Sequence, residues 1–221
     1  MDPITTLSDP AFEVPPVPDA PRGIAWLRAY VARFSRGTDH ARRRALVTAI
    51  LDPVDPGVLR KRAAELAAGR SADVARAVTV EVLAEALGLA VPADAVITVG
   101  RAYHPHLDAA PDTDAAVTTL VEACGGTWDE ATAARIGLLV QACDATAALV
   151  GNARRRTGDV DTAVAGTLRD DPPVRVTRRV RDGEPVTVDL GGLPFGAGPH
   201  ACPGRDHAIA IACGILEAGV R

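Results

Sequence analysis

The sequence predicts a mainly α-helical fold with a small β hairpin near the C-terminus. From Gly23 onward, alanine-rich segments with apolar residues at three- and four-residue spacing dominate, which is typical of amphipathic helices. Two short runs of β-type residues occur only late in the chain, on either side of Asp182-Gly183. The 221 residues are 48% hydrophobic and 24% charged, which suffices for one globular core.

Charge and cysteine content exclude several classes of protein. The formal net charge of −4 lacks the basic excess that nucleic-acid binding requires. No uncharged apolar run approaches the roughly 20 residues of a membrane span, and the N-terminus lacks a basic start and an apolar stretch, so we expect no membrane contact and a cytoplasmic location. The four cysteines form no C-x-x-C pair, which favours reduced thiols over disulfides or structural zinc.

Residues 1–22 are expected to form a separate arm. Six prolines in this segment deny the backbone helical hydrogen bonds and favour an extended conformation. No linker-like stretch follows, so we expect a single domain over residues 23–221. Within it, the spacing of Trp26, Leu27, Tyr30 and Phe34 indicates a first helix, and further helices are predicted at 38–50, 56–69 and 71–88.

The most informative helix is predicted over residues 127–153. Thr127 and Glu130 have the spacing of a capping box, and an apolar stripe from Ile136 to Val150 indicates a long, buried central helix. A helix at 158–169 follows and ends before Pro172-Pro173. Strands are predicted at 174–180 and 185–190, a glycine- and proline-rich loop at 191–204 and a last helix at 205–218.

The loop from Phe195 to Gly204 concentrates three glycines, a histidine and a cysteine just before a helix. Glycines let the backbone approach a flat macrocycle and point amides at a sulfur atom, and the helix N-terminus favours a thiolate at Cys202. The loop therefore suits a ligand cradle in which Cys202 is a candidate thiolate. The alternative is a glycine-rich connection with an inert, buried cysteine.

This loop resembles F-G-x-G-x-H-x-C-x-G, the haem-ligand signature of the cytochromes P450, and all six fixed positions match. The resemblance extends over roughly residues 24–221 and implies a reduced cytochrome P450-like fold with haem b as cofactor and Cys202 as the iron ligand. Phe195, Gly198, His200 and Gly204 would lie around the haem. Because a thiolate ligand favours O–O cleavage, the resemblance implies oxygen- or peroxide-dependent chemistry on a small organic molecule.

Two further segments are similar to parts of the family that bind the haem propionates. Thr38 to Arg44 resembles the helix in which His40 and Arg44, one turn apart on one face, would hold a propionate. Thr177 to Val180 resembles the strand that supplies another arginine, here Arg179, and His200 would add a contact. The guanidinium group suits a carboxylate. Without the resemblance, such arginines would be assigned to a solvated surface.

Three features depart from the family pattern. In the stretch similar to the oxygen-activating segment, Asp144 matches the acid that relays protons, but Ala145 replaces the threonine, so Thr146 would have to supply the alcohol. Gly166 replaces the glutamate of Glu-x-x-Arg, so Arg169 needs another partner, from Asp170, Asp171 or Glu184. Only 15 residues separate Arg179 from Phe195, where the family has several strands and a long loop, so the site is open or completed by a second copy of the chain.

A basic patch predicted from Arg42, Arg43, Arg60, Lys61 and Arg62 could receive an acidic ferredoxin and its reductase, or could be solvated surface charge. His104-Pro105-His106 is interpreted as a surface turn. Two alternatives to an oxidoreductase remain open: a haem-free relative that serves as scaffold or auxiliary subunit of another enzyme, and a haem binder or sensor without turnover.

Overall fold

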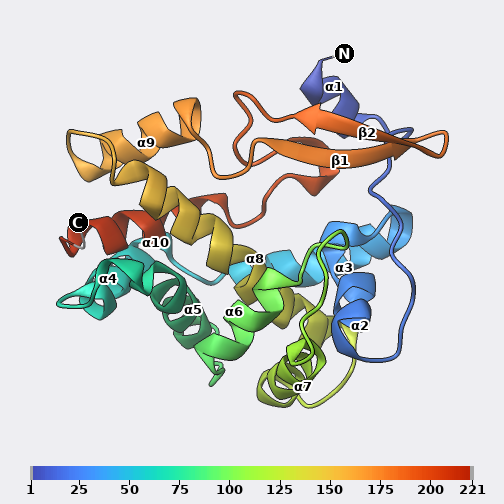
Figure 1. Cartoon of the computed structure of the whole chain (residues 1–221), viewed down its shortest axis with the longest axis horizontal. Helices are drawn as coiled ribbons and strands as arrows, with labels where there is room; N and C mark the ends of the chain where they lie inside the picture. The colour runs from blue at the N-terminus through green and yellow to red at the C-terminus, as the bar shows by residue number, and fades with distance from the viewer. Residues whose placement is uncertain (1, 220–221) are drawn as a thin grey trace.

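The computed structural model describes residues 2–219 as a mainly helical molecule with one two-stranded antiparallel sheet (Figure 1). The helices are α1 (Pro3–Ser8), α2 (Gly23–Tyr30), α3 (Gly37–Leu51), α4 (Pro56–Ala67), α5 (Ala75–Ala86), α6 (Ala93–Arg101), α7 (Thr113–Cys124), α8 (Glu130–Ala153), α9 (Val160–Asp170) and α10 (Arg205–Glu217). Three 3₁₀ turns are η1 (Ala32–Phe34), η2 (Ala72–Val74) and η3 (Gly198–His200). The strands are β1 (Val176–Arg181) and β2 (Glu184–Asp189).

Helix α8 runs through the centre of the molecule and packs against α2, α3, α5, α6, α7, α9 and α10 (Figure 1). It is long and apolar enough to cross a membrane by length and composition alone, but 56% of its apolar window is buried inside the fold. The sequence of α8 is apolar because the helix is buried in the core, as expected for a central helix.

Two apolar clusters meet along α8. The first joins α2, α6 and α7 to the N-terminal part of α8 through residues such as Trp26, Val99 and Leu139. The second joins α4, α5, α9 and α10 to its C-terminal part. Helices α4 and α10 cross closely at Gly214, where an added Cβ would overlap the main-chain carbonyl of Arg60 and lie 2.9 Å from the Ala63 Cβ. A close helix crossing of this kind requires a residue without a side chain.

The expected capping box at Thr127 is wrong. The N-cap of α8 is Asp129, whose carboxylate accepts a hydrogen bond from the Thr132 amide, while the Thr127 hydroxyl donates to Asp129. An aspartate two residues nearer the helix is an equally good cap. Glu130 does not cap the helix and instead forms ion pairs with Arg42 and Arg43 of α3.

The N-terminal arm is packed against the rest of the chain and begins with a helix that the sequence analysis did not predict. Asp2 caps α1 by accepting from the Thr5 amide, and Pro3 stands in the first turn, where a missing N–H costs nothing. Farther on, Glu13 and Val180 exchange main-chain hydrogen bonds of 2.9 and 2.8 Å, so the arm extends the sheet beside β1.

Other elements agree with the sequence expectations within a few residues, with two omissions. Helices α6 and α7 lie in the stretch 89–126, for which no element was predicted. The His104-Pro105-His106 segment forms a turn after α6, closed by a hydrogen bond from the Leu107 amide to the His104 carbonyl. Strands β1 and β2 pair antiparallel with Val176 opposite Asp189, and Asp182, with a φ of 52°, occupies the tight turn between them.

Candidate functional site

The loop that carries Cys202 is closed by its own main-chain hydrogen bonds. The Cys202 amide donates to the Phe195 carbonyl at 2.9 Å, and the Ala201 amide donates to the Gly198 carbonyl at 3.1 Å. Gly204 is the N-cap of α10, so Cys202 lies just before that helix, as expected from the sequence. The ring of Phe195 lies under the guanidinium of Arg205, 5.6 Å from its centroid.

Burial and the helix N-terminus act in opposite directions on the pKa of the Cys202 thiol. Cys202 is exposed to solvent as a residue, but many protein atoms surround its thiol. Desolvation is therefore the largest influence on the pKa of the thiol and raises it. The Gly204 amide, Arg44 and Arg33 act in the opposite direction but do not outweigh desolvation. The Gly204 amide at the start of α10 thus acts in favour of the thiolate, and a coordinated metal ion would remove the proton from a ligating thiol.

The structure brings together the four residues that the resemblance assigned to propionate binding. His40 and Arg44 come from α3, Arg179 from β1 and His200 from η3. The imidazole rings of His40 and His200 stack with their centroids 3.9 Å apart, and Arg44 Nη1 donates to the Ala201 carbonyl at 2.6 Å. Arg179 Nη1 donates to the main-chain carbonyl of the preceding residue at 2.9 Å. Three separate elements thus direct cationic or neutral nitrogen donors toward the cysteine loop.

These donors have no acidic partners within residues 2–219. No ion pair joins Arg44 or Arg179 to a carboxylate in this part of the chain. Burial lowers the pKa of both arginines, and burial followed by the proximity of His40 lowers the pKa of His200 to about 4. Buried cations without partners are costly, and their clustering is typical of a site for an anionic ligand.

Sequence reasoning missed two residues of this site. Arg33 of η1 lies close enough to lower the pKa of both Arg179 and Cys202 by its charge. The main-chain carbonyl of Ser35 accepts a hydrogen bond of 3.0 Å from His200 Nε2. Neither residue belongs to a motif, and a main-chain acceptor leaves no signal in a sequence, so only the fold could reveal them.

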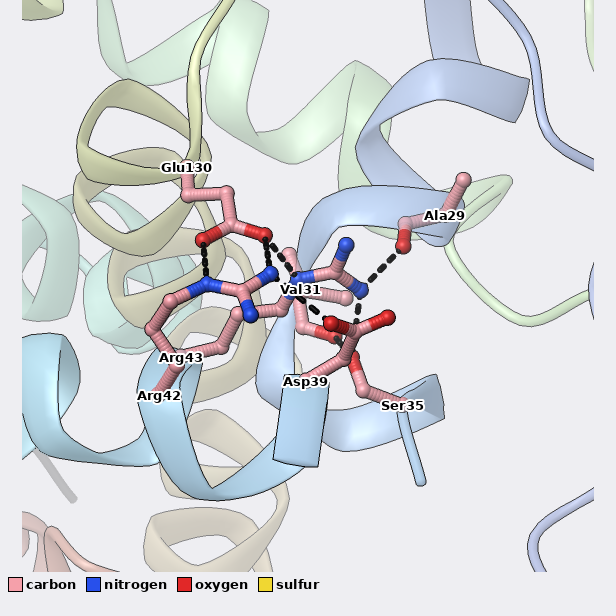
Figure 2. Close-up of polar contacts among 7 residues, drawn as sticks. All are labelled: Ala29, Val31, Ser35, Asp39, Arg42, Arg43 and Glu130. Carbon is pink, nitrogen blue, oxygen red and sulfur yellow. Dashed lines mark hydrogen bonds and ion pairs between the residues drawn. The ribbon is translucent and has the colours of Figure 1, made fainter. Parts of the chain in front are cut away.

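Ser35 also connects the site to the start of α8 (Figure 2). Its hydroxyl accepts a hydrogen bond of 2.7 Å from Arg43 Nη1, and Arg43 Nε donates to Glu130 at 2.7 Å. Arg42 binds the same carboxylate with two hydrogen bonds of 2.7 Å and also pairs with Asp39. The hydrogen bonds from the two arginines lower the pKa of Glu130 to about 2.

The basic patch predicted for an electron donor is largely neutralised by acidic side chains. Arg42 and Arg43 are held by Glu130, and Arg62 is paired with Glu65 and Glu85. Arg60 binds Asp161 and Glu217, which raise its pKa. Charges compensated in this way attract an acidic protein less strongly than the bare sequence suggested.

The α8 residues assigned to proton transfer lie on different sides of the helix. Asp144 Oδ1 accepts a hydrogen bond of 2.5 Å from Arg76 Nε of α5, and its side chain is 45% exposed. Thr146 is buried, and its hydroxyl has no hydrogen-bond partner in the described part of the chain. Ala145 is half-buried and Ala148 is exposed, and we call these two positions the open stripe of α8. The assignment of Thr146 as the replacement for the missing alcohol stays a prediction.

The loss of the glutamate at position 166 leaves no buried charge behind. Arg169 is exposed and pairs with Asp170, one of the three partners expected from the sequence. The space beside Gly166 is filled by Arg156, whose Nε would lie 2.8 Å from an added Cβ and whose guanidinium also binds Asp170. Arg169 is therefore not left as a buried, unpaired charge, which would be destabilising.

Solved structures with the same arrangement of helices were found by structural comparison. P450BioI in complex with an acyl carrier protein ligated to hexadec-9Z-enoic acid superposes with a TM-score of 0.72, at 16% identity over 99% of this chain and 81% of that one. The ligand-free P450 monooxygenase TamI gives 0.69, at 18% identity over 98% and 74% of the two chains. CYP164A2 of Mycobacterium smegmatis with econazole gives 0.65, at 20% identity over 97% and 78%.

The chain has the cytochrome P450 fold. In sequence, no family model and no curated protein matches it. At these identities the likeness shows the fold alone, so any activity has to be argued from the residues of the site. In this fold α8 lies at the centre of the described chain, and the cysteine loop directly precedes α10.

The residues around Cys202 fit haem. Among residues 2–219, no three His, Cys, Asp or Glu side chains come together to hold a bare metal ion. A single thiol at the end of a loop suits a metal that brings its own ring of nitrogen ligands. Arginines without acidic partners suit the two carboxylates of such a macrocycle, because the guanidinium fork matches a carboxylate.

Proposed function

We propose that this chain is a haem-thiolate oxidoreductase that acts on a small organic molecule, with Cys202 as the axial ligand of the iron. The observation that carries the proposal is the group of nitrogen donors without acidic partners around the cysteine loop: His40, Arg44, Arg179 and His200. A P450 fold that served only as a scaffold would have no reason to keep partly buried arginines unneutralised at this place.

Different residues would bind the haem propionates and transfer protons. Arg44 and Arg179 would bind the propionates, and the histidines would complete their hydrogen bonds. The bound haem would supply an iron centre for oxygen or peroxide chemistry, with the thiolate donating electron density. Asp144 would be the acid of a proton relay, but its hydrogen bond to Arg76 of α5 has to be broken or shared before it moves a proton.

Peroxide is the oxidant that the structure supports better than dioxygen with a ferredoxin. The hydroxyl that helps protonate dioxygen is absent at Ala145, and the hydroxyl of Thr146 is buried without a hydrogen-bond partner in the described part of the chain. The basic patch expected to dock a ferredoxin is compensated by acidic neighbours. Both observations favour peroxide, which needs no electron-transfer partner. A ferredoxin and its reductase are the partners to test against it.

Titration of the purified protein with haemin, followed by reduction and addition of carbon monoxide, tests the proposal. We expect one haem per chain and the red-shifted Soret band of a thiolate ligand. Cys202→Ala should lose this band, whereas Cys213→Ala, which alters a buried cysteine, should keep it. A protein that takes up no haemin would overturn the proposal and favour the haem-free scaffold. A thiolate band without turnover with peroxide or reductase would favour a haem sensor.

A further inference from the structure

The N-terminal arm makes an unusually close contact with the loop that carries Cys202. Gly198 has a φ of +67°, and a Cβ added to it would overlap the main-chain carbonyl oxygen of Leu7 and lie 2.9 Å from its carbonyl carbon. The same Cβ would lie 3.2 Å from the Cα of Ser8. This glycine of the signature is therefore required here by the backbone of α1, which is seated directly on the cysteine loop.

The contact is completed by an apolar cluster. Leu7 is buried together with Val188 and Leu190 of the hairpin region, and Leu193 and Ala197 of the loop pack against them. The connection from β2 to Phe195 is only five residues long, from Leu190 to Pro194, so it can bury little apolar surface by itself. Leu7 is the residue of the arm that packs in this cluster beside the loop.

A second attachment holds the arm beside Arg179. Glu13 pairs with Val180, the next residue of β1, through two main-chain hydrogen bonds, and its carboxylate binds Arg36, the residue after Ser35. Phe12 is buried beneath Arg181, whose guanidinium lies 4.9 Å from the ring centroid. The arm therefore contacts three segments that carry site residues: the cysteine loop, β1 and the turn before α3.

We propose that residues 2–14 form a positioning element for the haem site, with Leu7 as the positioning residue for the cysteine loop. In this chain the segment between β1 and the loop is short, so the arm provides apolar support that this segment lacks. The position of the loop governs the direction of the sulfur and of the amides around it, and such outer contacts tune a metal-bound thiolate. The part of this inference that concerns bound haem rests on the proposed haem-thiolate function.

Hydrogen exchange of the haem-free protein tests the positioning role without any cofactor. The amides of Gly196, Ala201 and Cys202 are hydrogen-bonded within the loop and should exchange slowly. Leu7→Ala and, independently, Gly198→Ala should speed their exchange about tenfold or more through local opening, while exchange in α8 changes little. Leu7→Met should restore the parent rate. Val117→Ala, a buried change in α7, and Ile4→Ala, an exposed change in α1, serve as matched controls.

The holo protein supplies a spectroscopic readout. In the reduced carbon monoxide complex, Leu7→Ala should convert part of the thiolate band into the band of a protein without thiolate ligation, and Val117→Ala should not. Loop exchange and thiolate band both unchanged in Leu7→Ala and Gly198→Ala would overturn the inference, even if the parent binds haem normally. A parent protein that binds no haem would overturn the proposed function, and the loop exchange rates would still decide the role of the arm.

Discussion

The Nη1 atom of Arg43 lies 2.7 Å from the hydroxyl oxygen of Ser35 and donates a hydrogen bond to it (Figure 2). Because the Ser35 carbonyl accepts from His200 and Arg43 is held by Glu130, a continuous chain of hydrogen bonds runs from the first residue of α8 to the cysteine loop. Glu130 is thus the residue through which the central helix is connected to the site.

The first prediction concerns the acid stability that Glu130 provides. Its pKa is about 2 in the folded protein, below its value of 4.5 in an unfolded chain, so its stabilisation is complete above about pH 5 and is lost as the pH falls toward 2. Glu130→Gln should lower the free energy of unfolding by about 2–3 kcal/mol at pH 7, because Arg43 is left buried without its partner. The difference from the parent should shrink as the pH falls from 5 to 2.

Urea unfolding of both proteins between pH 2 and 7 measures this difference. Glu65→Gln removes a carboxylate from an exposed pair with Arg62 and is the matched control, for which we expect less than about 1 kcal/mol at any pH. A Glu130→Gln effect that is equally small, or that does not depend on pH, would show that the carboxylate does not hold the two arginines in solution.

The second prediction concerns Arg179, a buried cation without an acidic partner in the described structure. Arg179→Met should leave the haem-free protein equally stable or stabilise it by about 1 kcal/mol, because a buried charge is removed. The same change should weaken haemin binding, by on the order of 1–3 kcal/mol for a charge-assisted hydrogen bond. Arg178→Met, at the exposed neighbouring position, should change neither quantity.

Haemin dimethyl ester, in which both propionates are masked, distinguishes a contact between Arg179 and a propionate from a structural role of Arg179 in the strand. Arg179→Met should bind the ester as tightly as the parent does, while its affinity for haemin falls. An equal loss of affinity for both compounds would mean that Arg179 supports the strand and does not meet a carboxylate.

The third prediction tests the close crossing of α4 and α10. Gly214→Ala should destabilise the protein by about 1–3 kcal/mol, because the added methyl group overlaps the Arg60 carbonyl. Gly151→Ala, in a part of α8 where an added Cβ meets nothing within 4 Å, should instead stabilise it by about 0.5–1 kcal/mol through helix propensity. Thermal unfolding of the two variants should therefore shift in opposite directions.

Local patterns in the sequence predicted most helices, because each pattern depends on residues a few positions apart. The apolar stripe of α8 and the cysteine loop are examples, and the loop also led to His40, Arg44 and Arg179 through the resemblance. What the sequence could not provide was the pairing of distant charges. That Arg42 and Arg60 are compensated depends on Glu130 and Asp161, which are 88 and 101 residues away.

The contacts of the N-terminal arm could not be predicted from the sequence either, because they too join residues that are far apart in the chain. Its prolines correctly indicated that most of it is not helical, but the burial of Leu7 and the pairing of Glu13 depend on surfaces formed by the last quarter of the chain. Even the glycine at 198 has two readings in the sequence, as a cradle for a macrocycle and as a site of close backbone contact. The contact with Leu7 supports the second reading without excluding the first.

The last prediction compares two adjacent positions on α8. Ala145→Thr should place a hydroxyl on the open stripe beside Asp144, and in a ferredoxin-driven assay it should raise the product formed per electron consumed, because cleavage of dioxygen needs ordered proton delivery. Thr146→Val removes a hydroxyl that is buried without a partner, so it should leave coupling unchanged and keep or raise stability by up to about 1 kcal/mol. Peroxide-driven turnover should respond little to either change, since peroxide arrives already reduced and protonated.

Asp144→Asn completes the comparison. It removes the ionised partner of Arg76 and the only carboxylate of the proposed relay, so it should slow both the dioxygen and the peroxide routes. Arg76→Gln is the matched change on the other side of the pair: it frees the carboxylate and should speed proton transfer if the ion pair restrains Asp144. If Thr146→Val uncouples turnover while Ala145→Thr has no effect, the hydroxyl that matters is the buried one, and the assignment of the open stripe of α8 to proton delivery is wrong.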